Sequence, residues 1–274
     1  MKPRPFDYAR PDTVAEAVAL LAECGDDARV LAGGQSLMAM MNLRLAEPSV
    51  LIDIARIAEL DAIRDLGDRI EVGAAVTQNK LLAWPALADK LPLLAAALPY
   101  VGHFQTRNKG TVCGSIAHAD PSSELPLSLA VLEGEVVLQS ARGTRTIAAS
   151  DFQIDMLTTA REPDELITAV RFPVAAGRGA AFREVARRHG DFAIIAVGAV
   201  IEGSTARLGV GGIAGRPVAQ RIALDGAEQV RDAIEALLAD LEDYEDLHAS
   251  AELRRDILRN LAPVVIAEAR RCAA

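Results

Sequence analysis

The pattern of apolar and polar residues predicts a helix near the start of the chain. Thr13 and Glu16 fit the S/T-x-x-E capping box, and Gly25 fits the residue that ends a helix. The apolar residues between them recur at the spacing of one helical face. They are Val14, Val18, Leu21 and Ala22. Residues 13–24 are therefore expected to form an amphipathic helix.

Short apolar runs follow this helix and predict strands. The runs are residues 28–31, 49–54 and 68–76. A helix followed by strands that a glycine turn separates indicates a small α/β unit. Residues 77–101 have a helical pattern, but Pro85 and Pro92 interrupt it. Two or three short helices are therefore expected there rather than one long helix.

Residues 102–126 show weak periodicity and are rich in glycine and small residues. We expect a long connection without regular structure, and in compact domains such connections are usually either functional or disordered. The modest charge of this segment and its embedded valine, isoleucine and alanine residues argue against disorder. The segment is therefore a candidate functional loop.

The rest of the pattern predicts a change from mixed structure to antiparallel strands and then to helix. The expected elements are a helix closing near residue 134, a hairpin within 135–150, a strand at 164–173, antiparallel strands with turns at 189–191 and 203–205, and mainly helix from about 227 to 274. Residues 174–180, which follow Pro173, are rich in glycine and alanine. We place a domain boundary in this segment.

Composition excludes several classes of function. The chain has 274 residues, of which 51% are hydrophobic, which suffices for one large domain or for two to three small ones. A net charge of −9, without a basic stripe between aromatics, argues against nucleic acid and anionic membranes as partners. No apolar run reaches the roughly 20 residues that span a bilayer, and no signal peptide is visible, so the cytoplasm is expected.

The three cysteines, Cys24, Cys113 and Cys272, are far apart and odd in number. This arrangement predicts no disulfide framework, no zinc site and no iron–sulfur ligand set on this chain. His118 likewise has no partner ligands at metal spacing.

Two loops that contain glycine are candidates for anion binding. The sequence AGGQS at 32–36 lacks the P-loop lysine and is not G-x-G-x-x-G, so an ordinary turn is one interpretation. The other is a phosphate cradle, because glycine lets backbone N–H groups approach an anion and a following helix start adds a positive dipole end. Ser36 would add a hydroxyl donor. Residues 110–115 have the same chemistry, and a diphosphate needs donors from two sides.

Stretches along the whole chain resemble one known family. They are FDYARPDTVAEAVALL, LAGGQSLMAMMNLRL, LIDIARIAEL, VGAAVT, TRNKGTVCGSIAHADPSSELP and EVARRHGDFA. In these stretches the chain is similar to the FAD-binding medium subunits of the molybdenum hydroxylases, relatives of xanthine dehydrogenase and carbon monoxide dehydrogenase. The resemblance implies a mixed α/β (α+β) fold. It comprises an FAD-binding domain of the vanillyl-alcohol-oxidase-like type at 1–175, with subdomains at about 1–55 and 56–175, and a C-terminal domain of antiparallel sheet and helices at 176–274.

The resemblance also implies which residues bind the cofactor. Ala32, Gly33, Gly34, Gln35, Ser36 and Leu37 match the first FAD loop, and Thr111, Val112, Cys113, Gly114 and Ser115 match the second. Together these sets would hold the diphosphate. Further matches are Asp120 and Glu124 at acidic positions near FAD, Ile167 beside the isoalloxazine, Arg183 at a basic position near the ring, and Val101 at an aromatic position near FAD in eukaryotic relatives.

One residue departs from the family pattern. The second loop usually has T-x-G-G, whereas this chain has Cys113 at the first of these glycines. If the position needs a positive φ, cysteine is strained there; if it needs only a small side chain, cysteine fits. Cys113 could serve packing or redox chemistry. His118 is either a structural residue or a neighbour of the adenosine half of FAD. Residues 187–189 either form a solvated face or contact a partner subunit or the edge of the flavin.

The function that the resemblance implies is electron transfer. A large molybdopterin-binding subunit would oxidise the substrate, and a small [2Fe–2S] subunit would pass electrons to FAD held non-covalently here and then to an external acceptor. The assembly would be a dimer of heterotrimers, and this chain would contribute no catalytic acid or base and no metal ligand. Two alternatives remain: a self-contained flavin dehydrogenase or oxidase, and a scaffold subunit that has lost FAD.

Overall fold

A three-stranded parallel sheet lies at the N-terminal end of the computed structural model, which describes residues 1–273. Its strands, in spatial order, are β1 (Asp7–Ala9), β3 (Val50–Asp53) and β2 (Ala28–Leu31), and they are connected by α1 (Val14–Cys24) and α2 (Leu37–Asn42). The capping prediction is confirmed, because the Thr13 hydroxyl accepts the Glu16 N–H at 3.2 Å. The sequence analysis missed β1, which is too short to show an apolar pattern.

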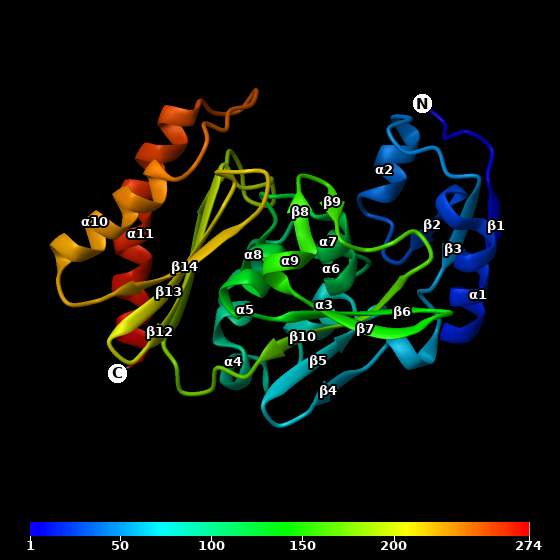
Figure 1. Ribbon diagram of the computed structural model, residues 1–274, viewed down its shortest axis with the longest axis horizontal. Helices are drawn as coiled ribbons and strands as arrows, with labels where there is room; N and C mark the ends of the chain where they lie inside the picture. The colour runs from blue at the N-terminus through cyan, green and yellow to red at the C-terminus, as the bar shows by residue number, and fades with distance from the viewer. Residues whose placement is uncertain (274) are drawn as a thin grey trace.

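A five-stranded antiparallel sheet forms the middle of the molecule (Figure 1). Its strands, in spatial order, are β4 (Ile63–Asp65), β5 (Arg69–Gly73), β10 (Leu166–Pro173), β6 (Glu135–Ser140) and β7 (Gly143–Ala148). The predicted hairpin within 135–150 and the predicted strands at 68–76 and 164–173 are confirmed.

Short helices pack around this sheet. They are α3 (Gln78–Leu82), α4 (Leu87–Lys90), α5 (Pro92–Ala97), α6 (Phe104–Arg107), α7 (Val112–His118), α8 (Glu124–Val131) and α9 (Ala149–Phe152). Short 3₁₀ turns lie at Gly25–Asp27, Ala58–Leu60 and Leu98–Tyr100. A small hairpin consists of β8 (Gln153–Asp155) and β9 (Thr158–Thr159). The predicted interruption by proline is confirmed, because α5 begins at Pro92, where a missing N–H costs no hydrogen bond.

The expectation of a connection without regular structure at 102–126 is wrong. Both α6 and α7 lie in this segment. Helix α7 forms because the Thr111 hydroxyl accepts the Gly114 N–H at 2.9 Å and because Val112, Cys113 and Ile116 bury their side chains. The glycine-rich composition obscured this short apolar face.

A four-stranded antiparallel sheet forms the C-terminal part. It consists, in order, of β11 (Ala180–Val185), β12 (Ile195–Glu202), β13 (Thr205–Gly211) and β14 (Val218–Ala223), and α10 (Ala227–Ala239) and α11 (Ala251–Cys272) cover one of its faces (Figure 1). The predicted strands, the turn at 203–205 and the C-terminal helices are confirmed. The sequence analysis did not predict β14.

Two apolar cores lie on opposite faces of this C-terminal sheet. On β11, Phe182 belongs to the larger core, and its neighbour Ala181 belongs to the smaller core beneath α10 and α11. The larger core also contains Val14 from α1, Ile52 from β3 and Val72 from β5. One continuous core therefore joins the two N-terminal sheets to the inner face of the C-terminal sheet. No helix within residues 1–273 is long and apolar enough to cross a membrane.

Candidate functional site

The loop that follows β2 lies directly against the segment that precedes α7. A Cβ atom on Gly33 would lie 2.2 Å from the Lys109 carbonyl oxygen and 2.7 Å from the Gly110 Cα. Only glycine permits this approach of two backbones. The Gln78 N–H in turn donates to the Gly110 carbonyl at 2.8 Å and holds the second segment in place. The structure thus brings residues 32–37 and 109–115 together.

The first loop presents a row of backbone donors. Gly34 has a φ of +70°, in the left-handed region, and the Gln35 side-chain amide donates to the Gly33 carbonyl at 3.1 Å. Within residues 1–273, the backbone N–H groups of residues 33–37 have no hydrogen-bond acceptor, and the Ser36 hydroxyl caps no helix. Successive unpaired N–H groups in such a turn form a concave site for an anion.

Most of the backbone N–H groups in the second loop have acceptors; within residues 1–273 the exceptions are those of Thr111 and Cys113. The Thr111 hydroxyl accepts the Gly114 N–H, and the Val112 N–H donates to the Val76 carbonyl at 3.1 Å. Gly114 and Ser115 follow in the first turns of α7, both half-buried. This loop is therefore a rigid wall beside the row of donors on the first.

Cys113 is a packing residue in this wall. It lies inside α7 with a negative φ, is 2% exposed, and its thiol donates to the Val72 carbonyl at 3.5 Å. Burial raises the pKa of the Cys113 thiol far above its ordinary value, which suppresses the reactive thiolate. The interpretation of a strained cysteine at a positive φ is wrong, because the position is helical and requires only a side chain that fits the core.

Other residues that the resemblance singled out lie farther along the chain. Val101 and Ile167 are 7% and 6% exposed and belong to the larger core, with Ile167 opposite Leu138 on β6. Asp120 forms the turn between α7 and α8, where its carboxylate accepts the Ser122 N–H at 2.8 Å. Glu124 is the first residue of α8 and is 5% exposed.

The side chain of Arg183 is not brought together with the two loops. In the register of β11 and β12, Arg183 is opposite Val197, which belongs to the smaller core beneath α11. The Arg183 guanidinium forms an ion pair at 2.7 Å with Glu268 on α11. The Arg183 side chain thus turns toward α11, whereas the resemblance led us to expect a basic side chain near the ring at this position. The next residue, Glu184, lies opposite Ala196 and shares with Phe182 the face of β11 that is turned toward the larger core.

The sequence analysis missed Glu184, which with Glu124 is one of two carboxyl groups with raised pKa values. Burial, reinforced by Asp120 and opposed by Arg107, raises the pKa of Glu124 to about 7. Burial and the nearby Glu124 raise the pKa of Glu184 to about 8. The alternation in AAFREV was the available signal, because it places Glu184 on the same face as the apolar Phe182.

His118 is half-buried at the end of α7, and burial lowers its pKa despite the nearby Asp120. Residues 1–273 contain no cluster of histidine, cysteine or acidic side chains arranged to hold a metal ion.

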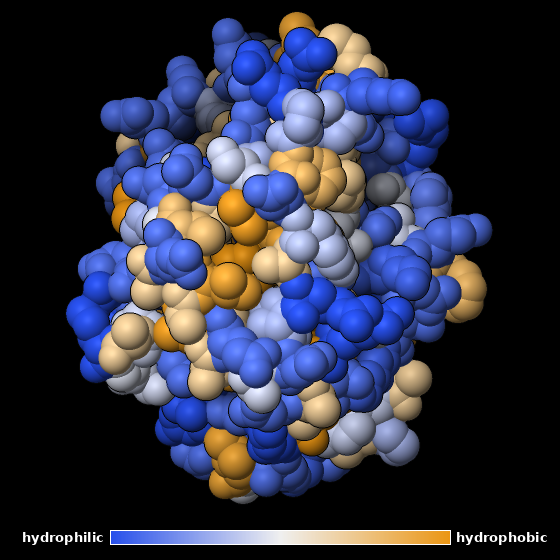
Figure 2. All heavy atoms as spheres, turned by 90° about the vertical axis from the view of Figure 1, so that its right-hand side faces the viewer, coloured by the Kyte–Doolittle hydropathy of each residue, from blue (hydrophilic) through white to orange (hydrophobic). Residues whose placement is uncertain are grey.

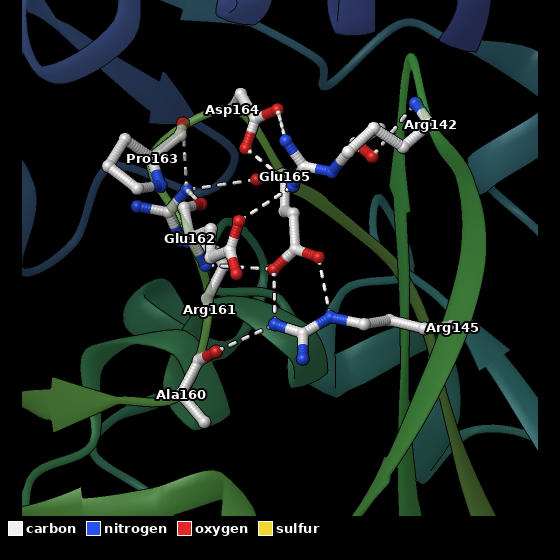
Figure 3. A network of polar contacts seen from close by, with 9 residues as sticks. Arg142, Arg145, Ala160, Arg161, Glu162, Pro163, Asp164 and Glu165 are labelled. Carbon is white, nitrogen blue, oxygen red and sulfur yellow. Dashed lines mark hydrogen bonds and ion pairs between the residues drawn. The ribbon is translucent and has the colours of Figure 1, made fainter.

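A network of arginines and acids fixes the segment that leads into β10 (Figure 3). Glu165 is 2% exposed, and the Arg145 guanidinium donates to its two oxygens at 2.6 and 2.8 Å. Burial alone would raise the pKa of Glu165. The hydrogen bonds from Arg145 and the Glu162 N–H lower it by more than that, so the net shift of this pKa is downward. The Arg161 guanidinium donates to the carbonyls of Glu162, Pro163 and Glu165. The start of β10, which carries Ile167, is thereby held firmly.

The fold and the paired glycine loops define an FAD-binding subunit of the molybdenum hydroxylase type. Residues 4–175 match the family described as the FAD binding domain in molybdopterin dehydrogenase, and residues 180–269 match the CO dehydrogenase flavoprotein C-terminal domain. The chain belongs to this family of FAD-dependent oxidoreductase subunits.

Individual relatives agree with this assignment. The chain is 37% identical to the alpha subunit of the 6-hydroxypseudooxynicotine dehydrogenase complex of Paenarthrobacter nicotinovorans, over 98% of this chain and 96% of that one. It is 38% identical to the carbon monoxide dehydrogenase medium chain of Hydrogenophaga pseudoflava, over 93% of each. A solved structure of carbon monoxide dehydrogenase from that organism, lacking the Mo-pyranopterin moiety, superposes with a TM-score of 0.94 at 36% identity, over 100% of both chains.

Proposed function

We propose that this chain holds FAD non-covalently with its diphosphate between the two glycine loops. The unpaired N–H groups of residues 33–37 carry this proposal, because they offer donors for which the described part of the chain supplies no acceptor. The contact of Gly33 with Lys109 supports a cradle that needs both loops. The residues that would line it are Ala32, Gly33, Gly34, Gln35, Ser36, Leu37, Thr111, Val112, Cys113, Gly114 and Ser115, with Cys113 contributing through its backbone.

The remaining residues would orient the rest of the cofactor. Val101, Ile167, Asp120 and Glu124 would lie along it, and the division of the chain near residue 175 would separate the cofactor domain from the C-terminal sheet that packs against it. FAD, when bound, supplies the ability to accept and release electrons. The task of this chain is to bind and orient it, and no side chain here serves as an acid or base toward the substrate.

We further propose that electrons originate at a large molybdopterin subunit, pass through a small [2Fe–2S] subunit to the FAD on this chain, and leave to an external acceptor. The whole assembly would be a dimer of heterotrimers. Relatives named as a medium chain or as a complex subunit support such partners.

Apolar side chains gather on the face shown in Figure 2. Just after α2, Leu43 and Leu45 are 60% and 71% exposed, which suits a partner contact. Three unpaired cysteines fit a reducing compartment such as the cytoplasm.

The experiment is a flavin titration followed by reconstitution. The purified chain, titrated with FAD, should bind one equivalent and show the flavin absorption bands. Addition of the partner subunits and a substrate of the complex should then bleach these bands, whereas the chain alone should not oxidise that substrate. Failure to bind FAD, both alone and in the complex, would refute the cofactor assignment. Substrate oxidation by the isolated chain would refute the electron-transfer role.

A further inference from the structure

An arginine lies buried between α11 and the C-terminal sheet. Arg254, in the first turn of α11, is 1% exposed. Its guanidinium forms an ion pair with Asp246 at 2.7 Å and lies over the ring of Tyr244, 5.1 Å from the ring centroid. Burial of a charged group is costly, and a well-packed apolar side chain in its place is often no less stable. Stability alone therefore does not explain why an arginine occupies this position.

The Arg254 guanidinium joins the ends of two neighbouring strands. Its Nη1 atom donates to the carbonyl of Ile194 at 2.5 Å and to that of Gly212 at 2.7 Å. Both residues lie just beyond the paired ends of β12 and β13, where the ladder no longer holds the strands together. A Cβ atom on Gly212, which has a φ of +79°, would collide with the Ile194 carbonyl oxygen. Arg254 thus fixes two backbone segments that are in direct contact.

One of these strand ends is hydrogen-bonded to the cofactor domain. The Gly212 N–H donates to the carbonyl of Pro121 at 2.9 Å, in the turn that follows α7. Pro121 comes directly after Asp120, which would lie along FAD in the proposed site. Since α7 begins at the second glycine loop, this bond also holds the far end of the helix that forms the rigid wall. The carbonyl and the N–H of Gly212 therefore connect Arg254 to the cofactor site.

The loop between β11 and β12, which ends at Ile194, makes a second contact with the cofactor domain. A Cβ atom on Gly190, which has a φ of +85°, would lie 2.7 Å from Cε1 of His103 and 3.1 Å from the carbonyl carbon of Gly102. Gly102 comes directly after Val101, another residue of the proposed site. Both segments that Arg254 holds thus reach the cofactor domain next to residues assigned to FAD.

We propose that Arg254 is a positioning residue for FAD: by holding the ends of β12 and β13 together, it sets how the C-terminal sheet meets the cofactor domain beside Val101 and Asp120. This inference rests on the proposed function. The Arg254 side chain is buried behind the sheet, so it acts through the backbone of Gly212 and Ile194. Without its bonds the two strand ends separate, the contacts with the cofactor domain loosen, and FAD binds more weakly.

The test compares FAD binding by the wild-type chain, Arg254→Met and Leu258→Ala. Methionine is long, unbranched and uncharged, so it fills much of the same space and removes the bonds to both carbonyls. Leu258 lies one turn further along α11 and is 0% exposed, and its truncation destabilises the same part of the molecule without removing either bond. It is therefore a matched control for lost stability.

The Kd for FAD should rise about fivefold in Arg254→Met and change by less than about twofold in Leu258→Ala, provided that both variants are folded. A wild-type Kd in Arg254→Met, or equal losses of affinity in the two variants, would overturn the inference alone. A wild-type chain that binds no FAD would overturn the proposed function as well.

A second measurement uses only the wild-type chain and so does not depend on whether a variant folds. Because coupling between two sites is reciprocal, FAD must strengthen the contact that strengthens its own binding. Saturating FAD should slow amide exchange of Gly212 by about fivefold. The Leu224 amide donates to the Ser204 carbonyl at 3.0 Å, at the opposite end of β13, and should be slowed much less. Equal slowing of the two amides, or no slowing of Gly212 with FAD bound, would overturn the inference.

Discussion

The two glycine loops meet in space, but their backbones are satisfied to different extents. Among the described residues, the N–H groups of residues 33–37 all lack acceptors, whereas most of those in the second loop have one, including Gly114, which donates to the Thr111 hydroxyl. In the proposed site, the first loop would therefore supply most of the donors for the diphosphate, and the second would supply a fixed wall. Similar composition therefore conceals different tasks, and substitutions in the two loops should have different consequences.

The largest effect is expected from Gly33→Val, which breaks the contact between the loops. The new side chain would collide with the backbone of Lys109 and Gly110, which cannot move as a flexible side chain can. Overpacking of this kind costs about 1–3 kcal/mol, which corresponds to an increase in the Kd for FAD of about fivefold to about 150-fold if the bound state bears the whole cost. The Kd is measured by quenching of flavin fluorescence. Undiminished affinity would mean that the loops do not act together.

Gly34→Ala tests the orientation of the donors in the first loop. Alanine at a φ of +70° is strained by about 1–2 kcal/mol, and relief of that strain turns the N–H groups away. The matched control is Gly203→Ala, at a φ of +63° in the remote turn between β12 and β13. Both variants should lose similar thermal stability, but only Gly34→Ala should lose FAD affinity, by about fivefold. Equal FAD affinity in the two variants would contradict the role of the first loop.

Cys113→Gly restores the glycine of the family pattern and tests the wall. Glycine inside a helix costs about 1 kcal/mol, and the loss of a buried side chain adds to that cost. The variant should therefore unfold at lower denaturant concentration while its Kd for FAD changes by less than about twofold. A marked gain in FAD affinity would show instead that cysteine impairs the site.

The smallest effect is expected from Arg183→Gln. The Arg183 side chain is 50% exposed and is paired with Glu268 on the face of β11 that α11 covers. Its replacement should leave both the Kd for FAD and its pH dependence unchanged in the same fluorescence titration. A clear loss of affinity would mean that this side chain reaches the cofactor after all.

The sequence predicted most of the fold because its long elements carry periodic apolar faces. The capped helix α1, the hairpin of β6 and β7 and the strands β11 to β13 all show such patterns. It failed where elements are short: β1 has three residues, and α7 depends on the Thr111 cap within a glycine-rich segment.

The residues of the candidate site were likewise predictable from the sequence only in part. The loop residues were identifiable because glycine and hydroxyl side chains mark them in the sequence. The contact of Gly33 with Lys109 was not, because it joins segments distant in the chain. The orientations of Arg183 and Glu184 depend on strand register, in which a shift of one residue exchanges the two faces of the sheet.

The most direct test of the central claim is amide hydrogen exchange of the purified chain with and without FAD. The N–H groups of residues 33–37 have no acceptor within the described chain, so they should exchange rapidly without FAD and become protected on its addition. The capped amide of Gly114 should change much less, because it is already bonded to Thr111. Saturating FAD binding with no new protection at residues 33–37 would contradict the account.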